Sequence, residues 1–266
     1  MLALLLSVIM LVSVFFAFTA CDPDGSGDSD GDDRVPEPYE ELLVGMPDRT
    51  DYASNRIVDF ANGSSSVFRS VGGYSNGKEF DTFWLNENVT YRNSKMQLNF
   101  AAYNSAYPWS GGEVQSSRSD YSYGYYATSM KPMNKSGIIS SFFTYTSRPK
   151  WDEIDVEFLG KSMTSVQFNY YTSGVGGHEY HYNLGFDASQ SFHVYGFDWS
   201  EEKIVWYIDG KPVYAANTDI PTSPTKIMMN LWKPFDQYSG WSGAFDGSTG
   251  IPGYAEYEWV IYVPYV

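Results

Sequence analysis

The sequence is short of cysteine, because Cys21 is the only one among 266 residues. A single thiol excludes a disulfide within the chain and any metal site that needs several cysteines. Histidine is also scarce, and the three residues His178, His181 and His193 do not have the spacing of a metal-binding set. The folded part of the chain must therefore depend on its apolar core for stability.

Basic residues are few as well: 17 Lys and Arg stand against 32 Asp and Glu, which gives a formal net charge of −15. No stretch of the chain gathers Lys and Arg into a basic stripe. A phosphate backbone would be repelled by such a surface, so we expect no nucleic-acid partner. The sequence also has no phosphate-cradling glycine motif and no nucleophile elbow, which argues against phosphate-binding and serine-nucleophile chemistry.

The only long apolar run occupies residues 1–20 and ends in small residues directly before Cys21. This pattern is typical of a secretory signal. FTAC at residues 18–21 resembles a bacterial lipoprotein box, so we predict a signal segment at 1–21 and lipidation of Cys21. Ordinary cleavage near Ala20 is the alternative, and the run is also long enough for a membrane-spanning helix. Both kinds of signal predict an exported protein, extracellular or at the cell surface, that meets the membrane only through its N-terminus.

Residues 22–51 begin with DPDGSGDSDGDD and predict a flexible acidic linker. Residues 52–266 show no internal repeat and no long helical period, but many short β-rich runs separated by Gly, Asn, Ser and Pro. The spacing predicts one all-β domain, a sandwich or barrel. Asp209-Gly210 predicts a tight hairpin turn, because this pair readily takes positive φ values. The predicted strands cover residues 95–100, 123–130, 137–145, 166–171, 192–199, 204–208, 227–232 and 254–263.

One stretch, WDEIDVEF at residues 151–158, alternates acidic and apolar residues without a break. Because successive side chains of a strand point to opposite faces, Glu153, Asp155 and Glu157 share one face. Carboxylates this close raise each other's pKa, which can keep one protonated and another ionised at neutral pH. Such a set suits glycoside hydrolysis, which uses two carboxylates. A solvated acidic face and a Ca²⁺ site are the alternatives, and the spacing alone does not choose the reacting pair.

Aromatic residues make up 18% of the chain and include 23 Tyr and 8 Trp, more than core packing normally needs. Aromatic rings can stack on the C–H faces of sugars, and Tyr and Trp add a polar edge. We assign to the core Phe142, Phe168, Phe197 and Trp206. We predict sugar contacts for Tyr145, Trp151, Tyr171 and Trp232, which lie beside the acidic strand or match cleft positions of the family that the chain resembles.

Five blocks of the chain carry a resemblance to a known family: WDEIDVEFLGK at 151–161, VQFNYY at 166–171, GVGGHE at 174–179, LGFDAS at 184–189 and KIMMNLW at 226–232. They closely resemble bacterial lichenases of glycoside hydrolase family 16, which are endo-1,3-1,4-β-glucanases. The resemblance runs from about Gly73 to Trp259 and implies a two-sheet jelly roll, concanavalin A-like, with a concave substrate cleft.

The resemblance also implies roles for individual residues. It makes Glu153 the nucleophile, Glu157 the acid/base and Asp155 the residue that tunes the nucleophile, with no cofactor in the chemistry. Further positions that match the family's substrate contacts are Asn76, Glu113, Phe143 and Asn230.

The predicted partner is therefore mixed-linkage β-glucan, cut at β-1,4 bonds next to β-1,3 bonds with retention of configuration. Two alternatives stay open. One is a related family 16 activity on xyloglucan or laminarin, as hydrolase or transglycosylase. The other is a glucan-binding surface protein without catalysis, against which the three intact carboxylates argue. We expect the protein to be a monomer.

The sequence departs from the family at three places. Bacillus-type lichenases carry a disulfide between two loops, where this chain has Thr82 and, approximately, Gly111. The family has a substrate-contacting Arg where Gln115 stands, with Arg118 nearby, and which of the two takes its place stays open. Glu258 occupies a position where lichenases use an Asp to help hold a structural Ca²⁺. Glu can also bind Ca²⁺, so we predict a Ca²⁺ ion at Glu258 that has a structural role and no part in catalysis.

Overall fold

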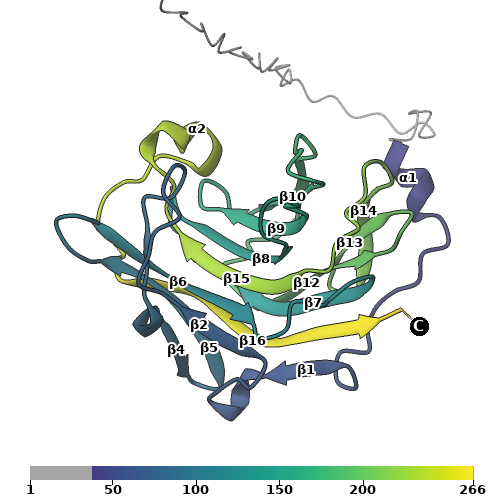
Figure 1. Ribbon diagram of the computed structural model, residues 1–266, viewed down its shortest axis with the longest axis horizontal. Coiled ribbons are helices and arrows are strands. Elements are labelled where there is room, and N and C mark those ends of the chain that lie inside the picture. Colours follow the sequence, from purple (N-terminus) through teal and green to yellow (C-terminus); the bar gives the residue numbers. More distant parts are fainter. Residues whose placement is uncertain (1–37, 266) are drawn as a thin grey trace, which may run out of the picture. The chain divides into compact units, whose positions relative to one another are not determined.

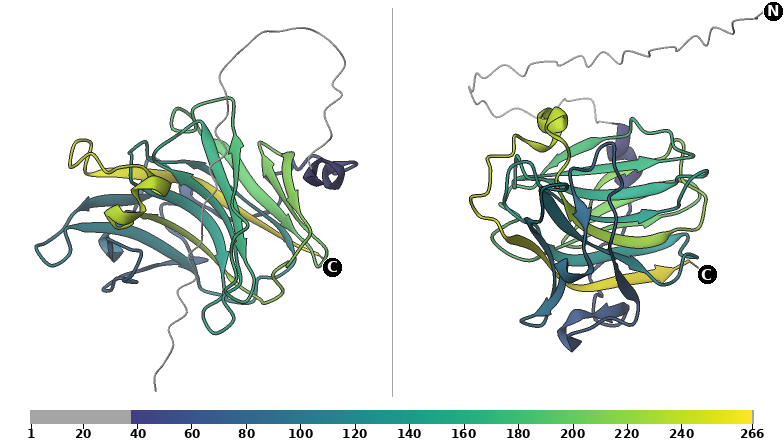
Figure 2. Two further views of the ribbon diagram at one scale, coloured as in Figure 1. Left: turned by 90° about the horizontal axis from the view of Figure 1, so that it is seen from above. Right: turned by 60° about the vertical axis from the view of Figure 1, so that its left-hand side comes forward.

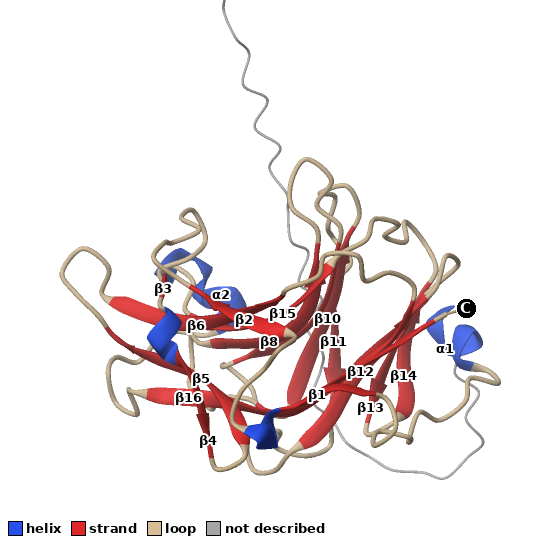
Figure 3. Ribbon diagram, turned by 60° about the horizontal axis from the view of Figure 1, so that its bottom comes forward, coloured by secondary structure: helices blue, strands red, loops and turns tan. Residues whose placement is uncertain are grey.

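The computed structural model describes residues 38–265. The predicted signal at 1–21, with Cys21, and residues 22–37 of the predicted linker lie outside this part of the chain. Strands dominate the described residues and the helices are short (Figures 1 and 3). None of the helices within residues 38–265 is long and apolar enough to cross a membrane. The helical elements are α1 (Pro38–Leu43), α2 (Ser239–Ser242) and the 3-10 turns η1 (Phe60–Asn62), η2 (Asn86–Asn88) and η3 (Asp236–Tyr238).

The strands form two sheets that join where β5 pairs with β6, and both sheets are strongly curved (Figure 2). The inner sheet contains β11 (Tyr180–Asn183), β10 (Ser165–Tyr171), β9 (Glu153–Leu159), β8 (Ile139–Tyr145), β15 (Lys226–Trp232), β6 (Trp109–Ser116) and β2 (Phe68–Val71), in that order. The outer sheet runs β5 (Lys95–Ala102), β16 (Gly253–Pro264), β7 (Gly124–Lys131), β12 (His193–Trp199), β13 (Ile204–Ile208) and β14 (Lys211–Ala216), with β4 (Val89–Arg92) on β5 and β1 (Arg56–Asp59) on β16. A short β3 (Phe83–Trp84) pairs parallel to β6.

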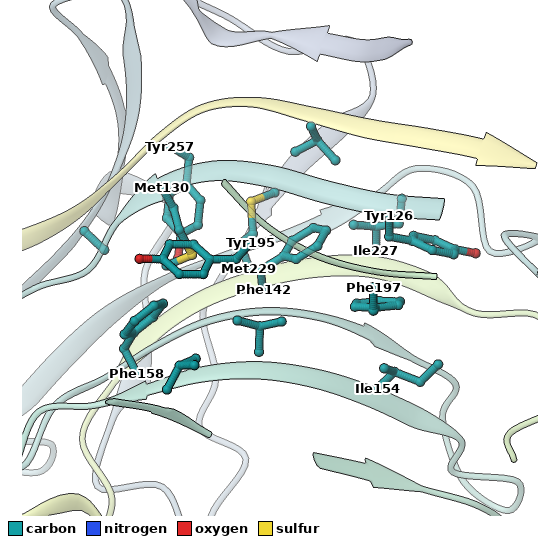
Figure 4. Packing of buried hydrophobic residues seen from close by; sticks show 14 of the residues in the cluster. Tyr126, Met130, Phe142, Ile154, Phe158, Tyr195, Phe197, Ile227, Met229 and Tyr257 are labelled. Carbon is teal, nitrogen blue, oxygen red and sulfur yellow. The ribbon is translucent and has the colours of Figure 1, made fainter. Parts of the chain in front are cut away.

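The main core lies between the two sheets. The apolar residues of β9 alternate with its carboxylates as predicted, and Ile154, Val156 and Phe158 are fully buried. Figure 4 shows Ile154 and Phe158 among buried side chains of both sheets. Phe142, Phe168, Phe197 and Trp206 are also fully buried, which confirms their assignment to the core. The predicted all-β sandwich is therefore confirmed.

Each of the predicted strands is present, with ends that differ from the prediction by at most two residues. Asp209 and Gly210 both have positive φ, 48° and 78°, and connect β13 to β14 as the predicted tight turn. The sequence did not predict β6, whose WSGGEVQS contains two glycines and reads as a loop. Gly111 is needed there, because a Cβ at this position would lie 2.2 Å from the carbonyl oxygen of Leu231.

Thr82 and Gly111, which stand at the positions of the disulfide in Bacillus-type lichenases, are neighbours in the fold. A Cβ on Gly111 would lie 2.8 Å from the Cγ2 methyl of Thr82. In place of a crosslink, the buried Thr82 hydroxyl donates to the carbonyl of Lys233 at 3.0 Å and accepts from the Lys233 amide at 2.9 Å. Two hydrogen bonds therefore join the loop before β3 to the end of β15.

The prediction of a flexible linker through residue 51 is wrong for residues 38–51. This segment lies against the outer sheet, with α1 beside β14 (Figure 1). Leu42 and Met46 pack against a buried cluster on the outside of that sheet, and the Arg49 amide donates to the carbonyl of Gly210 at 2.8 Å. The apolar residues that follow the acidic stretch supply the anchoring that a linker lacks.

One attachment of this segment is Arg49, which forms an ion pair with the buried carboxylate of Asp198. Burial raises the pKa of Asp198, and the Arg49 guanidinium opposes this rise. Arg49→Ala would leave the carboxylate buried, with the Tyr265 hydroxyl as its one remaining side-chain donor among residues 38–265. We expect the free energy of unfolding in urea to fall by about 3 kcal/mol.

Arg118→Ala provides the control for this experiment, because the ion pair of Arg118 with Asp120 is exposed, at 63% and 67% of the two side chains. Its removal should change the free energy of unfolding by no more than about 0.5 kcal/mol. Equal effects of the two substitutions would contradict the structural role given to Arg49.

Candidate active site

The three carboxylates of β9 project from the face of the inner sheet that is opposite the core, which we call the carboxylate face. Antiparallel pairing with β8 and β10 places polar and aromatic side chains on either side of each carboxylate. The cross-strand neighbours are Tyr145 and Tyr171 for Glu153, Phe143 and Asn169 for Asp155, and Ser141 and Gln167 for Glu157. The predicted catalytic and aromatic residues are thus brought together by strand register.

Glu153 is held by two donors. The indole N–H of Trp151 donates to Glu153 Oε2 at 2.6 Å, and the Asp155 carboxyl forms a second hydrogen bond with Glu153. Burial raises the pKa of Glu153 to about 7, and the bonds from Trp151 and Asp155 limit this rise. Both contacts stabilise the ionised form of Glu153.

Trp151 reaches Glu153 from an unusual backbone conformation, with φ of 43°. Its carbonyl accepts from the Gly174 amide at 2.8 Å, and its ring stacks on Tyr171 with centroids 4.9 Å apart. The Arg148 guanidinium also lies 4.4 Å from the Trp151 ring centroid. The Gly-rich loop is required here, because a Cβ on Gly176 would lie 2.3 Å from the Tyr171 ring. Protein groups therefore already contact much of the Trp151 ring.

Asp152, which the sequence did not single out, anchors this turn. Its buried carboxylate accepts from the backbone amides of Ser173, Thr222 and Ser223 at 2.7, 3.0 and 2.8 Å. These three donors lower the pKa of Asp152 against the effect of burial. Asp152 therefore fixes the start of β9 and, through it, the position of Trp151.

Glu157 has a different environment. Gln167 Nε2 donates to Glu157 Oε2 at 2.9 Å, and the indole N–H of Trp241 donates to Gln167 Oε1 at 2.9 Å, which fixes the amide orientation. Burial raises the pKa of Glu157 to about 8, and the charge of Glu153 adds to this rise. The sequence missed Gln167, although the alternation in VQFNYY places it on the same face as Tyr171. Trp241 comes from α2 and has no local sequence signal.

Asp155 is the most deeply placed of the three carboxyls. Burial raises its pKa well above the usual range, and the charges of Glu153 and Glu157 raise it further. This rise favours the protonated form of Asp155, which donates the hydrogen bond to Glu153. The site holds one carboxyl that ionises more easily, Glu153, and one that retains a proton to higher pH, Glu157. This asymmetry is what acid/base chemistry with a carboxylate nucleophile needs.

The carboxylate face continues across β15 and β6, where Asn230 lies opposite Glu113. Glu113 is only 2% exposed. Its carboxylate accepts from the Tyr74 hydroxyl at 3.2 Å, from Gln115 Nε2 at 3.1 Å and from Asn230 Nδ2 at 3.4 Å. Asn230 also accepts from the Ser141 hydroxyl. Glu113 and Asn230 are therefore both buried and bound to protein groups.

The other predicted substrate contacts differ in accessibility. Tyr145 and Tyr171 are half-buried, while Asn76 is exposed in the turn that follows Tyr74. Phe143 is 7% exposed and Trp232 is 6% exposed. Trp232 offers less surface than the sequence suggests, because Phe80 stacks on its ring with centroids 4.1 Å apart.

Gln115 and Arg118, the two candidates for the position of the family's substrate-contacting Arg, lie in different surroundings. Gln115 lies on β6 with its side chain beside Glu113, whereas Arg118 follows the end of the strand. Arg118 is exposed, pairs with Asp120 and lies over the Tyr121 ring. Of the two residues, only Gln115 therefore lies in the hydrogen-bond network around Glu113.

Glu258 lies away from the carboxylate face, in β16 of the outer sheet, and its Oε2 accepts from the Ser129 hydroxyl at 2.7 Å. Within residues 38–265 no group of three or more His, Cys, Asp or Glu side chains could hold a metal ion. One carboxylate and one hydroxyl do not by themselves make a Ca²⁺ site. A structural Ca²⁺ at Glu258 stays a prediction.

Comparison with known proteins agrees with this geometry. Residues 76–248 match the family model described as glycosyl hydrolases family 16. The chain is 50% identical over 205 residues to a beta-glucanase of Paenibacillus polymyxa, covering 75% of this chain and 83% of the relative. It is 46% identical over 213 residues to a beta-glucanase of Bacillus subtilis (strain 168), covering 77% and 85%.

Solved structures give the same result. A prokaryotic beta-1,3-1,4-glucanase (lichenase) derived from a mouse hindgut metagenome is similar with a TM-score of 0.74 and 41% identity, over 78% of this chain and 98% of that chain. The beta-glucanase of Bacillus licheniformis is similar with a TM-score of 0.74 and 43% identity, over 80% and 100%. These neighbours support the two-sheet fold found here.

Proposed function

This chain belongs to glycosyl hydrolase family 16, and on that premise we propose that it is a retaining endo-glucanase of mixed-linkage β-glucan, cutting β-1,4 bonds next to β-1,3 bonds. The names of its relatives support the substrate class. The observation that carries the proposal is the unequal environment of Glu153 and Glu157 on one face of β9.

In the proposed mechanism Glu157 donates its proton to the glycosidic oxygen while the Glu153 carboxylate attacks the anomeric carbon. The bond to the leaving sugar breaks and a glycosyl ester on Glu153 forms. Glu157, now ionised, takes a proton from water, whose oxygen attacks the same carbon and releases Glu153. Trp151 and Asp155 stabilise the charge on Glu153, and Gln167 orients Glu157.

The pH dependence of kcat/KM should be bell-shaped, because Glu153 must be ionised and Glu157 must be protonated. Activity rises as pH increases through the pKa of Glu153, about 7, and falls as pH increases through that of Glu157, about 8. Initial rates on barley β-glucan across this range measure both limbs. A rate that continues to rise above the second pKa would contradict the role of Glu157.

Digestion with product analysis tests the substrate. Lichenan and barley β-glucan should be cut to short oligosaccharides that end in a β-1,3-linked glucose, whereas laminarin and xyloglucan should remain intact. Cleavage of xyloglucan or laminarin instead would support another family 16 activity. Transfer products in place of hydrolysis would indicate a transglycosylase, and binding without any released reducing ends would indicate a glucan-binding protein.

The surroundings of the enzyme are also part of the proposal. The apolar run before Cys21 supports export and lipid anchoring at the cell surface. We propose in addition that the folded domain acts as a monomer. Incorporation of a labelled fatty acid that is lost in Cys21→Ser tests the anchor. A fall in the melting temperature on addition of a chelator tests the structural Ca²⁺ at Glu258.

A further inference from the structure

The loop that joins β15 to β16, residues 233–252, carries α2 and with it Trp241 (Figure 1). We call it the α2 loop. The indole N–H of Trp241 donates to Gln167 Oε1 at 2.9 Å, and Gln167 Nε2 donates to Glu157 Oε2 at 2.9 Å. The orientation of the proposed acid/base therefore depends on where this loop places Trp241.

Lys233 begins the α2 loop and is only 3% exposed. Its ammonium donates to Asp81 Oδ2 at 2.9 Å, to Asp236 Oδ1 at 2.7 Å and to the carbonyl oxygen of Pro234 at 3.1 Å. An ammonium has three donors, so all of them are engaged. Lys233 therefore ties η3, the first turn of the loop, to the segment that precedes β3.

A second buried lysine, Lys135, holds the part of the loop that follows α2. It lies between β7 and β8, is 7% exposed, and donates to the carbonyl oxygen of Thr249 at 2.6 Å. Its ammonium also forms an ion pair with Asp246. The Phe245 ring contacts both lysines, with its centroid 5.3 Å from Lys135 Nζ and 5.4 Å from Lys233 Nζ, within the range of cation–π attraction. The loop is thus held by a cation before α2 and by another after it.

Neutral backbone hydrogen bonds attach the α2 loop as well. The Phe235 amide donates to the carbonyl of Glu79 at 2.9 Å, and the amides of Gly137 and Lys161 donate to the carbonyl of Ser242 at 3.2 and 3.1 Å. These bonds keep the loop against the rest of the domain. The loss of one cation would therefore shift α2 rather than detach the loop.

The charge of Lys233 offsets two carboxylates, because Asp81 and Asp236 both approach its ammonium. With a neutral side chain at position 233, the two carboxylates would face each other across an uncharged group. Their repulsion would push η3 away from the segment before β3. Since α2 follows η3 without a break, Trp241 would move with it.

From these contacts we propose that Lys233 is a positioning residue for the acid/base Glu157, acting through Trp241 and Gln167, and that Lys135 is the second support of the same loop. The inference rests on the role proposed for Glu157. Lys233 is too deeply buried to touch a sugar, so it acts on the chemical step without binding the substrate.

Lys233→Met tests the proposal, because it keeps the length of the side chain and removes its charge. On the glucan that the wild type cuts, we expect kcat to fall about tenfold, part of the contribution of a general acid, while KM changes less than about twofold. The hydrogen bond from Gln167 lowers the pKa of Glu157, so its loss should move the alkaline limb of the pH profile to higher pH. The variant leaves in place the other carboxyls that act on Glu157, which are Glu153, Asp155 and Glu179.

Lys131→Met is the matched control. Lys131 also pairs with a buried carboxylate, that of Glu256 at 2.8 Å, but it lies on β7 of the outer sheet. This variant should lower the melting temperature and leave kcat and the alkaline limb unchanged. Trp241→Phe removes the donor to Gln167 directly, so it should reproduce the shift of the limb, and in combination with Lys233→Met it should add little.

Asp236→Ala is a second test, which does not depend on the folding of Lys233→Met. The Asp236 side chain is 87% exposed, so its removal should not unfold the chain, yet it takes away the ion pair that attaches η3. The alkaline limb should move in the same direction as in Lys233→Met, by a smaller amount.

The wild type and the variants distinguish the two proposals. A wild type that cuts no glucan would overturn the proposed function and this inference with it. An alkaline limb that stays in place in Lys233→Met, or in Asp236→Ala where Lys233→Met does not fold, would overturn the inference alone, as would additive effects of Lys233→Met and Trp241→Phe. Equal falls in kcat in Lys131→Met and Lys233→Met would assign the loss to stability and would also overturn the inference.

Discussion

Glu153→Ala should lower kcat on mixed-linkage glucan by at least about 10³-fold, because the variant lacks the carboxylate that forms the glycosyl ester. The stability of the fold should not decrease. Burial raises the pKa of Glu153 to about 7, so at higher pH its charge opposes folding, and its removal should leave the melting temperature at pH 8 equal or higher.

Azide makes the experiment specific. In Glu153→Ala the space left by the carboxylate admits azide, which attacks the anomeric carbon from the side of the lost nucleophile. On a glucoside with a good leaving group, activity should return and the glycosyl azide should have inverted configuration. Glu202→Ala, which removes an exposed carboxylate near the β12–β13 turn, should retain full activity. Wild-type rates in Glu153→Ala would end the assignment.

Glu157→Ala should show the complementary behaviour. Hydrolysis of unactivated glucan should fall by about 10²–10⁴-fold, the usual contribution of a general acid. Substrates whose leaving group needs no proton should still form the glycosyl ester on Glu153, so that release of the ester becomes the slow step. Azide should then attack from the Glu157 side and give a product with retained configuration.

The two variants together distinguish the roles of the glutamates. Glu157→Ala should also lose the alkaline limb of the pH profile, since that limb reports the pKa of Glu157, about 8. Glu157→Gln serves as a second variant that preserves the contact with Gln167. Azide products of the same configuration from Glu153→Ala and Glu157→Ala would contradict the proposed division of labour.

Much of the site could be predicted because side chains two residues apart in a strand project from the same face of the sheet. That rule alone places Glu153, Asp155 and Glu157 on one face, while their separate roles come from the family resemblance. The same rule applied to β10 would have found Gln167. Asp152 could not be found in this way, because its partners Ser173, Thr222 and Ser223 come from distant loops.

Other features depend on tertiary contacts that composition obscures. β6 contains Gly111 and Gly112, which indicate a turn in sequence but here permit close packing against neighbouring backbone. Residues 38–51 follow an acidic stretch, whose composition predicts a linker, although Leu42 and Arg49 attach these residues to the outer sheet. Two predicted substrate contacts also offer less surface to substrate than the sequence suggests. Phe80 stacks on the Trp232 ring, and the Tyr74 hydroxyl binds Glu113.

The Thr82 hydroxyl joins two loops through its hydrogen bonds with Lys233, near the position where Bacillus-type lichenases carry a disulfide. Such a joint forms as soon as the chain folds and requires neither an oxidant nor an isomerase. Residues 38–265 contain no thiol, so reductants should leave the catalytic domain unaffected.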